Sequence, residues 1–353
     1  EYGIYISYDD GESWNSFQKN LPQVPITDIK IKDNSLIVAT QGRGIWVLDD
    51  LTVLHQLNLE IINDEINLFK PKDSYRLSGS GGKKSKIAGT NLENGVIVYY
   101  NLKTYDSKKD SVSISFSDLN GKIIKTFSNF DSKNNLKPKK GSNKFVWDTK
   151  YEGAEILDGM IFWSVSFSGA KASPGKYKVE LTKNRVKKSK TFDILINPNS
   201  EAEVNGIQMQ VSFVNSINKL VDKAHKAIKK IRKINKTLIE FEENYEGSNQ
   251  LISQSKKLRN QLLKIEKTLY QTQNQSSQDP LNFPIKLTNK LGHLNSLVTY
   301  DDFPPTNQDE EVRAELTNKV DEQLKKFNNL IDQDLKKFND EFTELKLDYL
   351  KID

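Results

Sequence analysis

The sequence predicts a chain of several domains in which β-sheets come first and α-helices follow. Up to about residue 200, short apolar runs alternate with Gly, Asn, Asp and Ser, a pattern typical of strands joined by tight turns. From about residue 203, apolar residues recur every three or four positions, which is the period of a helix packed on one face. At 353 residues the chain is long enough for two or three domains.

The composition excludes several classes of protein. The chain has no Cys, which excludes disulfides, thiolate nucleophiles and Cys-based zinc sites. Its three His residues (His55, His225 and His293) are far apart and form no metal-binding motif, so we expect no metal and no cofactor. No apolar run approaches the ~20 residues of a membrane-spanning helix. A net charge of +5 is too small to indicate a nucleic-acid partner.

Residues 1–57 and 58–200 predict two β-domains. In the first, we expect strands at residues 2–7, 26–31, 36–39 and 45–48. The chain enters the first of these with no leader segment, and we therefore expect it to be the later part of a longer polypeptide. In the second, seven short strands predict a β-sandwich, at residues 96–102, 112–116, 122–127, 144–147, 161–167, 177–181 and 191–196.

Residues 201–353 predict an antiparallel helical bundle. Apolar stripes run over residues 214–238, 251–269, 287–298 and 312–345. Proline residues between the stripes favour helices that fold back on one another over one long coiled coil. The first helix is rich in Lys and the last one begins with Asp and Glu, so we expect the two to form ion pairs with each other.

One segment fits a specific motif. Residues 7–14 match Ser-x-Asp-x-Gly-x-Ser/Thr-Trp at every defined position, through Ser7, Asp9, Gly11, Ser13 and Trp14. The Asp side chain can accept backbone N–H groups within a hairpin turn, and Gly can take a positive φ. The Trp side chain is expected to pack beneath the turn, between adjacent sheets. We therefore expect these five residues to have a structural role.

This octapeptide resembles the Asp box, or BNR repeat, of sialidase-like and sortilin-like β-propellers. Residues 36–51 are similar to the closing blade of large secreted propeller proteins that are often labelled glycosyl hydrolases. The resemblance implies terminal propeller-blade strands over residues 1–57, upstream blades of the same polypeptide as partners, and an extracytoplasmic location. In these families the Asp box lies away from the active site.

The middle region is similar to the Ig-like domain of flagellar hook-capping proteins and of secretion-associated modules. The matching residues are 118–124, 141–148 and 173–177. The turn at residues 91–95 departs from the family pattern, because Leu92 replaces a Pro. The resemblance thus implies an Ig-like β-sandwich over residues 58–200, followed by the helical bundle.

The catalytic set of a sialidase cannot be assembled from residues 1–57, whereas their Asp residues leave a glycosidase carboxylate pair open. A sialidase needs an arginine cluster, and residues 1–57 contain only Arg43. The adjacent Asp49 and Asp50 follow a strand, where a capping role is expected rather than catalysis. The glycine-rich segment 79–85 fails the phosphate-loop pattern, since Leu77 replaces its first Gly and Lys84 its Ser or Thr.

Two features bear on ligands. Lysines recur in the loops of residues 58–200 and would attract an anionic glycan if the loops gather at one end; the alternative is a solvated surface. The members of this candidate patch are Lys83, Lys84, Lys137, Lys139, Lys140, Lys187 and Lys188. Trp46, Trp147 and Trp163 could stack on sugars, but their expected place in strands favours burial in the core.

Two hypotheses of function follow. The preferred one is a non-catalytic C-terminal region of an extracytoplasmic Asp-box propeller protein, acting in protein or glycan binding and scaffolding. The alternative is the accessory end of a glycoside hydrolase whose active site lies mostly in upstream blades. The expected partners are upstream blades and another protein or an anionic glycan, with no nucleic acid, no membrane span, no metal and no cofactor.

Overall fold

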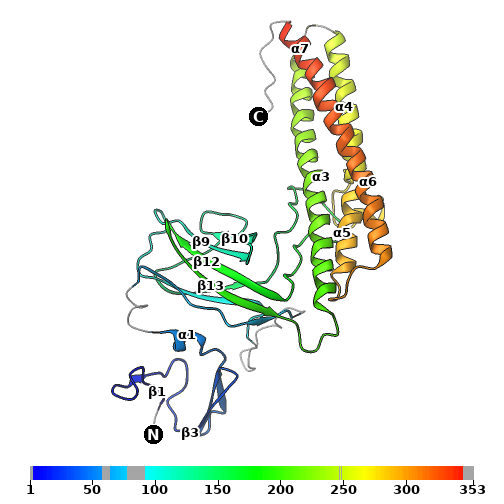
Figure 1. The fold of residues 1–353 in the computed structure, drawn as a ribbon. Helices are drawn as coiled ribbons and strands as arrows, with labels where there is room; N and C mark the ends of the chain where they lie inside the picture. The colour runs from blue at the N-terminus through cyan, green and yellow to red at the C-terminus, as the bar shows by residue number, and fades with distance from the viewer. Residues whose placement is uncertain (1–2, 58–63, 78–91, 246, 248, 345–353) are drawn as a thin grey trace. The chain divides into compact units, whose positions relative to one another are not determined.

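The computed structural model describes residues 3–57, 64–77, 92–245, 247 and 249–344 (Figure 1). The chain divides into two compact units, which we call the sheet unit (1–149 and 174–197) and the helical unit (150–173 and 198–353). The predicted order of β-structure followed by α-structure is confirmed. None of the described helices combines the length and the apolarity needed to cross a membrane.

The sheet unit begins with short antiparallel strands joined by tight turns. The strands β1 (Tyr5–Ile6) and β2 (Asn15–Ser16) pair with each other. A three-stranded antiparallel sheet follows, made of β3 (Ile26–Lys32), β4 (Ser35–Thr40) and β5 (Ile45–Leu48). Its first turn has positive φ at both Asp33 and Asn34, as a type I′ hairpin requires. The helix α1 (Thr52–Gln56) comes next.

The rest of the sheet unit contains two further sheets. One has the strand order β10-β9-β12-β13-β7 and the other β11-β8-β6. The bounds are β6 (Ile66–Leu68), β7 (Ser74–Tyr75), β8 (Val96–Leu102), β9 (Val112–Asp118), β10 (Ile123–Ser128), β11 (Gly141–Trp147), β12 (Gly175–Lys183) and β13 (Val186–Leu195). The fully buried Phe116 of β9 stacks on the fully buried Trp147 of β11, with ring centroids 4.2 Å apart. The two sheets therefore share one aromatic core.

The helical unit consists of helices that pack side by side (Figure 1). The long helix α3 (Val204–Asn244) contacts α4, α5 and α6. The other elements are α4 (Asn249–Leu269), the 3-10 turn η1 (Asp279–Leu281), α5 (Leu287–Val298), α6 (Asn307–Asn329), the π-helical turn η2 (Leu330–Leu335) and α7 (Lys336–Glu344). Each of the four predicted apolar stripes lies on helices, and the last one spans α6, η2 and α7 up to residue 344; residue 345 lies outside the described part of the chain.

The π-helical turn η2 has a cause in the sequence. Buried apolar residues in this part of the chain step by three from Phe327 to Leu330, by five to Leu335 and by three again to Phe338. A step of five would rotate the stripe away from the core in a regular α-helix. The wider π-turn, with its i→i+5 hydrogen bonds, keeps Leu335 on the buried side. Ile331, next to Leu330, is only half-buried, whereas Leu330 and Leu335 are buried.

Ion pairs join α3 to α4. Arg232 of α3 bonds to the nearly buried Glu266 of α4 at 2.7 Å, and Arg259 of α4 bonds to Glu242 of α3 at 3.0 Å. We expected the acidic residues at the start of the last helix to form ion pairs with the lysines of α3. For the acidic residues of α6 whose ion pairs the structure shows, this expectation was wrong. Three of these carboxylates pair within α6 itself, as Glu310–Arg313, Glu315–Lys319 and Glu322–Lys326.

Residues 150–173 leave the sheets between β11 and β12 and lie along the helices. We predicted a strand at residues 161–167, which is wrong, because no strand forms there. Side chains of the helical unit bind this backbone instead. The side chain of the buried Asn289 accepts the Trp163 N–H at 2.8 Å and donates to the Trp163 carbonyl oxygen at 3.2 Å. The Tyr270 hydroxyl accepts the Ile161 N–H at 2.8 Å.

The same segment packs tightly on α3 and α5. A Cβ atom at Gly292 of α5 would lie 2.8 Å from Cβ of Val165, so this close approach requires glycine. His225 of α3 contacts the rings of Phe162 and Phe167, and its Nδ1 bonds to the carbonyl oxygen of Glu155. Burial lowers the pKa of His225, against the bond to Glu155 and the charge of nearby Asp222, and the side chain is therefore neutral at pH 7.

We predict that Asn289→Ala destabilises the helical unit by about 2–4 kcal/mol, because it removes two hydrogen bonds and leaves the Trp163 amide buried without a partner. Denaturant unfolding followed by helical circular dichroism measures the effect. The matched control, Asn328→Ala at an exposed position of α6, should stay within about 0.5 kcal/mol of the wild type. An equal loss of stability in the two variants would show that the hydrogen bonds from Asn289 to Trp163 do not stabilise the unit.

Candidate functional site

The octapeptide at residues 7–14 forms the turn between β1 and β2, with Asp9 at its centre. One carboxylate oxygen of Asp9 accepts the Ser13 backbone N–H at 2.9 Å and the Ser7 hydroxyl at 2.7 Å. The other oxygen accepts the Ser13 hydroxyl. These bonds, those from Ser13 above all, lower the pKa of Asp9 to about 2. The carboxylate is thus ionised and fully engaged within the turn, which leaves it no role as a proton donor.

The remaining motif residues complete the same turn. Gly11 has a φ of +97° and donates its N–H to the Ser7 hydroxyl oxygen at 2.7 Å. The Trp14 indole N–H donates to the Gly11 carbonyl oxygen at 3.1 Å. The structure therefore brings all five predicted residues together. The expected burial of Trp14 is not seen among the described residues, because this side chain is 64% exposed.

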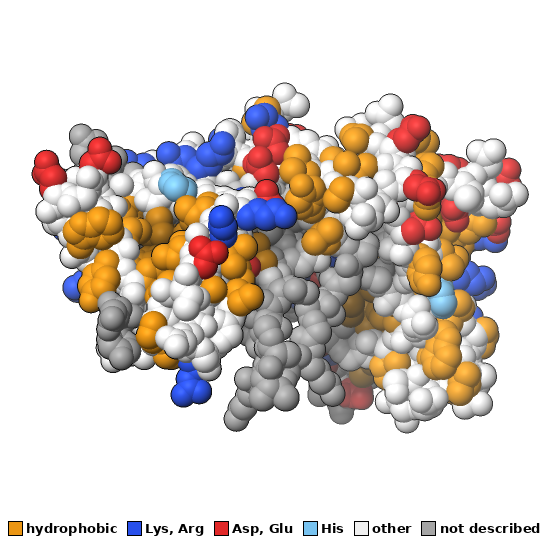
Figure 2. All heavy atoms as spheres, turned by 90° about the horizontal axis from the view of Figure 1, so that it is seen from below, with side chains coloured by type: hydrophobic (Ala, Val, Ile, Leu, Met, Phe, Trp, Pro, Cys, Tyr) orange, Lys and Arg blue, Asp and Glu red, His pale blue; other side chains and the backbone are white. Residues whose placement is uncertain are grey.

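The three-stranded sheet that follows carries apolar side chains on both faces. Strand pairing defines what we call the Trp46 face, with Ile29, Ile31, Leu36, Val38, Trp46 and Leu48. It also defines the Val47 face, which has Ile37, Ala39, Ile45 and Val47 on β4 and β5 and the charged Asp28, Lys30 and Lys32 on β3. Ile31 is 66% exposed on the first face, and Ile45 is 72% exposed on the second. Figure 2, which looks onto this part of the chain, shows hydrophobic side chains at the surface.

The carboxylates beside the sheet have structural roles. Asp50 precedes Leu51, the N-cap of α1, and accepts the Thr52 backbone N–H at 2.9 Å, whereas the N-cap itself makes no side-chain hydrogen bond. In the part of the chain that the structure describes, no group of three or more His, Asp or Glu side chains could hold a metal ion. The carboxylates Asp9 and Asp50 are thus both engaged in local hydrogen bonds.

The predicted lysine patch lies partly outside the described residues, which do not include Lys83 and Lys84. Strand register places the others, in the loop before β11 and at the start of β13, at the same end of the two sheets. Two of them have carboxylate partners there, since Lys187 bonds to Glu180 at 2.9 Å and Lys188 to Asp64 at 3.0 Å. This end is therefore a surface of mixed charge. For Lys137, Lys139 and Lys140, anion binding stays a prediction.

The tryptophans differ in their surroundings. Trp147 lies fully buried in the core between the sheets, as expected. Trp46 is half-buried and donates its indole N–H to the Arg43 carbonyl oxygen at 3.0 Å. Trp163 is half-buried in the segment that Asn289 clamps. None of these positions forms an open platform of the kind that sugar stacking needs.

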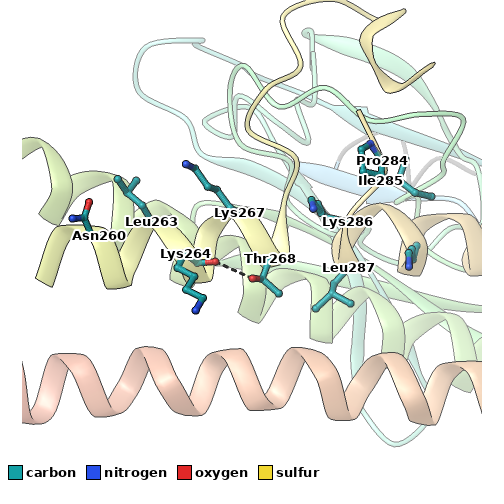
Figure 3. Close-up of a pocket in the computed structure, with 10 residues that line it drawn as sticks. Asn260, Leu263, Lys264, Lys267, Thr268, Pro284, Ile285, Lys286 and Leu287 are labelled. Carbon is teal, nitrogen blue, oxygen red and sulfur yellow. Dashed lines mark hydrogen bonds between the residues drawn. The ribbon is translucent and has the colours of Figure 1, made fainter. Parts of the chain in front are cut away.

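The helical unit contains a basic hollow that was not predicted from the sequence. It has a volume of about 690 Å³ and lies between the end of α4 and the start of α5 (Figure 3). Its lysines are Lys264, Lys267, Lys286 and Lys290. Lys264 and Lys267 belong to α4, whereas Lys286 and Lys290 lie about 20 residues further along, so only the fold places the two pairs together.

Comparison with known proteins adds no relative. No protein-family model matches the chain, and no curated protein sequence matches it. The resemblance to Asp-box propellers therefore depends on the octapeptide and the strands beside it. What the chain does has to be inferred from that turn, from the sheet that follows it and from the charged surfaces.

We predict that Asp9→Asn loosens the turn, because one amide oxygen cannot replace two carboxylate oxygens that accept three hydrogen bonds. The Trp14 indole N–H signal in a proton–nitrogen NMR spectrum should then move and exchange faster with solvent. The control is Asp10→Asn, at a positive φ that Asn tolerates well, and it should leave the signal in place. An unchanged Trp14 signal in Asp9→Asn would show that the carboxylate does not hold the turn.

Proposed function

We propose that this chain is the non-catalytic C-terminal region of an extracytoplasmic Asp-box propeller protein, and that it acts in protein or glycan binding and scaffolding. The observation that carries the proposal is the Asp-box turn followed at once by a three-stranded sheet with apolar side chains on both faces. Upstream blades of the same polypeptide are the proposed occupants of these faces.

The two apolar faces support this choice of partner. A sheet at the edge of a two-layer domain needs one apolar face and keeps the other polar. A propeller blade is packed between two neighbouring blades, so both of its faces are apolar. Strands β4 and β5 have this second pattern, with Val38 and Trp46 on one face and Ile37 and Val47 on the other. The exposed Trp14 would be covered in the same way.

The rest of the sheet unit supports an Ig-like sandwich as the next module. Its two sheets are almost wholly antiparallel and share an aromatic core around Phe116 and Trp147. Two hydrogen bonds join this module to residues 1–57. The Gln56 side chain accepts the Lys70 N–H and donates to the Lys70 carbonyl oxygen. We propose that the sandwich holds the propeller end.

We predict that Ile31→Lys combined with Val47→Lys destabilises the protein that includes the proposed upstream blades by more than about 3 kcal/mol, because each face would bury an unpaired charge. In the chain of 353 residues the same variant should stay within about 1 kcal/mol of the wild type, because both positions are exposed there. Thermal unfolding of both proteins measures the difference.

The matched control places two lysines on another exposed apolar site of the sheet unit, as Leu119→Lys and Ile123→Lys. It should have little effect in either protein. If the Ile31 and Val47 variant lost the same amount of stability in the longer protein as in the 353-residue chain, the blade assignment would be contradicted. A coding sequence without further Asp boxes upstream would contradict it as well. Turnover of a glycan by the 353-residue chain alone would contradict the non-catalytic role.

A further inference from the structure

The basic hollow of the helical unit has no counter-charge of its own. Asn260, Leu263, Thr268, Pro284, Ile285 and Leu287 line it together with its four lysines, and no carboxylate does. The Thr268 hydroxyl donates to the Lys264 carbonyl oxygen, so it is used within α4 (Figure 3). In the described part of the chain, none of the four lysines makes an ion pair. Glu315, which attracts Lys290 from a distance, bonds directly to Lys319.

The spacing of these lysines works against the stability of the helices. Lys264 and Lys267 are three residues apart on α4, and Lys286 and Lys290 are four apart at the start of α5. Like charges at these spacings repel each other on a helix. Elsewhere in the same unit the equivalent spacing joins opposite charges, as in Glu315–Lys319 and Glu322–Lys326. A bound anion would offset this repulsion, because the ammonium groups that line the hollow would attract it.

The start of α5 adds to the positive potential of the hollow. This helix has 12 residues, and its N-cap, Lys286, makes no side-chain hydrogen bond to the helix. The first turn of an α-helix carries a partial positive charge on its free N–H groups. By contrast, α6 begins with a capping box in which Thr306 and Asp309 bond to each other's backbone N–H groups. Lys286, Leu287 and Lys290 bring the uncapped end of α5 to the hollow.

We propose that this hollow binds an acidic oligosaccharide, one that carries carboxylate or sulfate groups on neighbouring sugar rings. A volume of about 690 Å³ lies within the range of sites for organic ligands of several rings and is far larger than one phosphate group requires. Leu263, Pro284 and Ile285 supply apolar surface for the carbon faces of the rings. The four lysines supply ammonium groups for the acidic groups.

The inference deepens the glycan-binding part of the proposed function and does not need the blade assignment. Failure of the blade test would leave the hollow unchanged, because the hollow is formed within the helical unit alone. Failure of the hollow would leave the two apolar faces of the sheet as they are. The two experiments therefore give separate answers.

The test is calorimetric titration of the 353-residue chain at low ionic strength with four probes: tetragalacturonate, a sulfated heparin-type tetrasaccharide, neutral maltotetraose and inorganic tripolyphosphate. We expect at least one acidic tetrasaccharide to bind and maltotetraose not to bind. Added salt should weaken the binding, because it screens exposed charges. Lys267→Gln combined with Lys290→Gln should weaken it about tenfold, and circular dichroism should show the helices intact.

The control variant removes the same charge from a second hollow, of about 670 Å³, between α3 and α6. There Asp321 lies among the lysines, and the variant is Lys226→Gln with Lys230→Gln. It should bind the acidic tetrasaccharide as the wild type does. Absence of binding by both acidic tetrasaccharides would overturn the proposal. An equal loss of affinity in the two double variants would also overturn it. So would binding of tripolyphosphate as tight as that of the acidic tetrasaccharides, since the site would then recognise only negative charge.

Discussion

The backbone of residues 150–173 has to be hydrogen-bonded inside the helical unit, and much of that unit is organised around this constraint. An extended segment without a neighbouring strand would bury unpaired N–H and carbonyl groups at a high cost. The side chains of Asn289, Tyr270 and Asn218 take the place of the missing strand. Glycine at position 292 then allows the segment to approach α5 closely. This role explains why the polar side chains of Asn218, Tyr270 and Asn289 face the inside of the unit.

The sequence predicted most elements of the fold because their signals are local. The strands β8, β9 and β12 follow runs of alternating apolar residues, and the helices follow stripes of regular period. The strands β6 and β7 were missed because three and two residues are too few for a pattern. Residues 161–167 have the pattern of a strand, but the partner of an extended segment is decided by tertiary structure, and here it is a set of helical side chains.

The candidate sites show the same division between local and distant information. The Asp9 turn was predictable in detail, because its bonds join residues at most four positions apart. The exposure of Trp14 was not, since it depends on what covers the turn. The basic hollow was missed because its two pairs of lysines come together only when α5 packs beside the end of α4. The pairing of the acidic residues within α6 could have been read from their spacing to Lys and Arg.

The π-helical turn between α6 and α7 has a consequence for how this protein tolerates changes in length. Losing one exposed residue there, such as Gln333, would shorten the step from Leu330 to Leu335 to four and restore an ordinary α-helix with the same buried side. An insertion or deletion of one residue elsewhere in this helix would rotate the apolar residues beyond it away from the buried side. Among relatives of this chain, differences in the length of the last helix should therefore be concentrated at this turn.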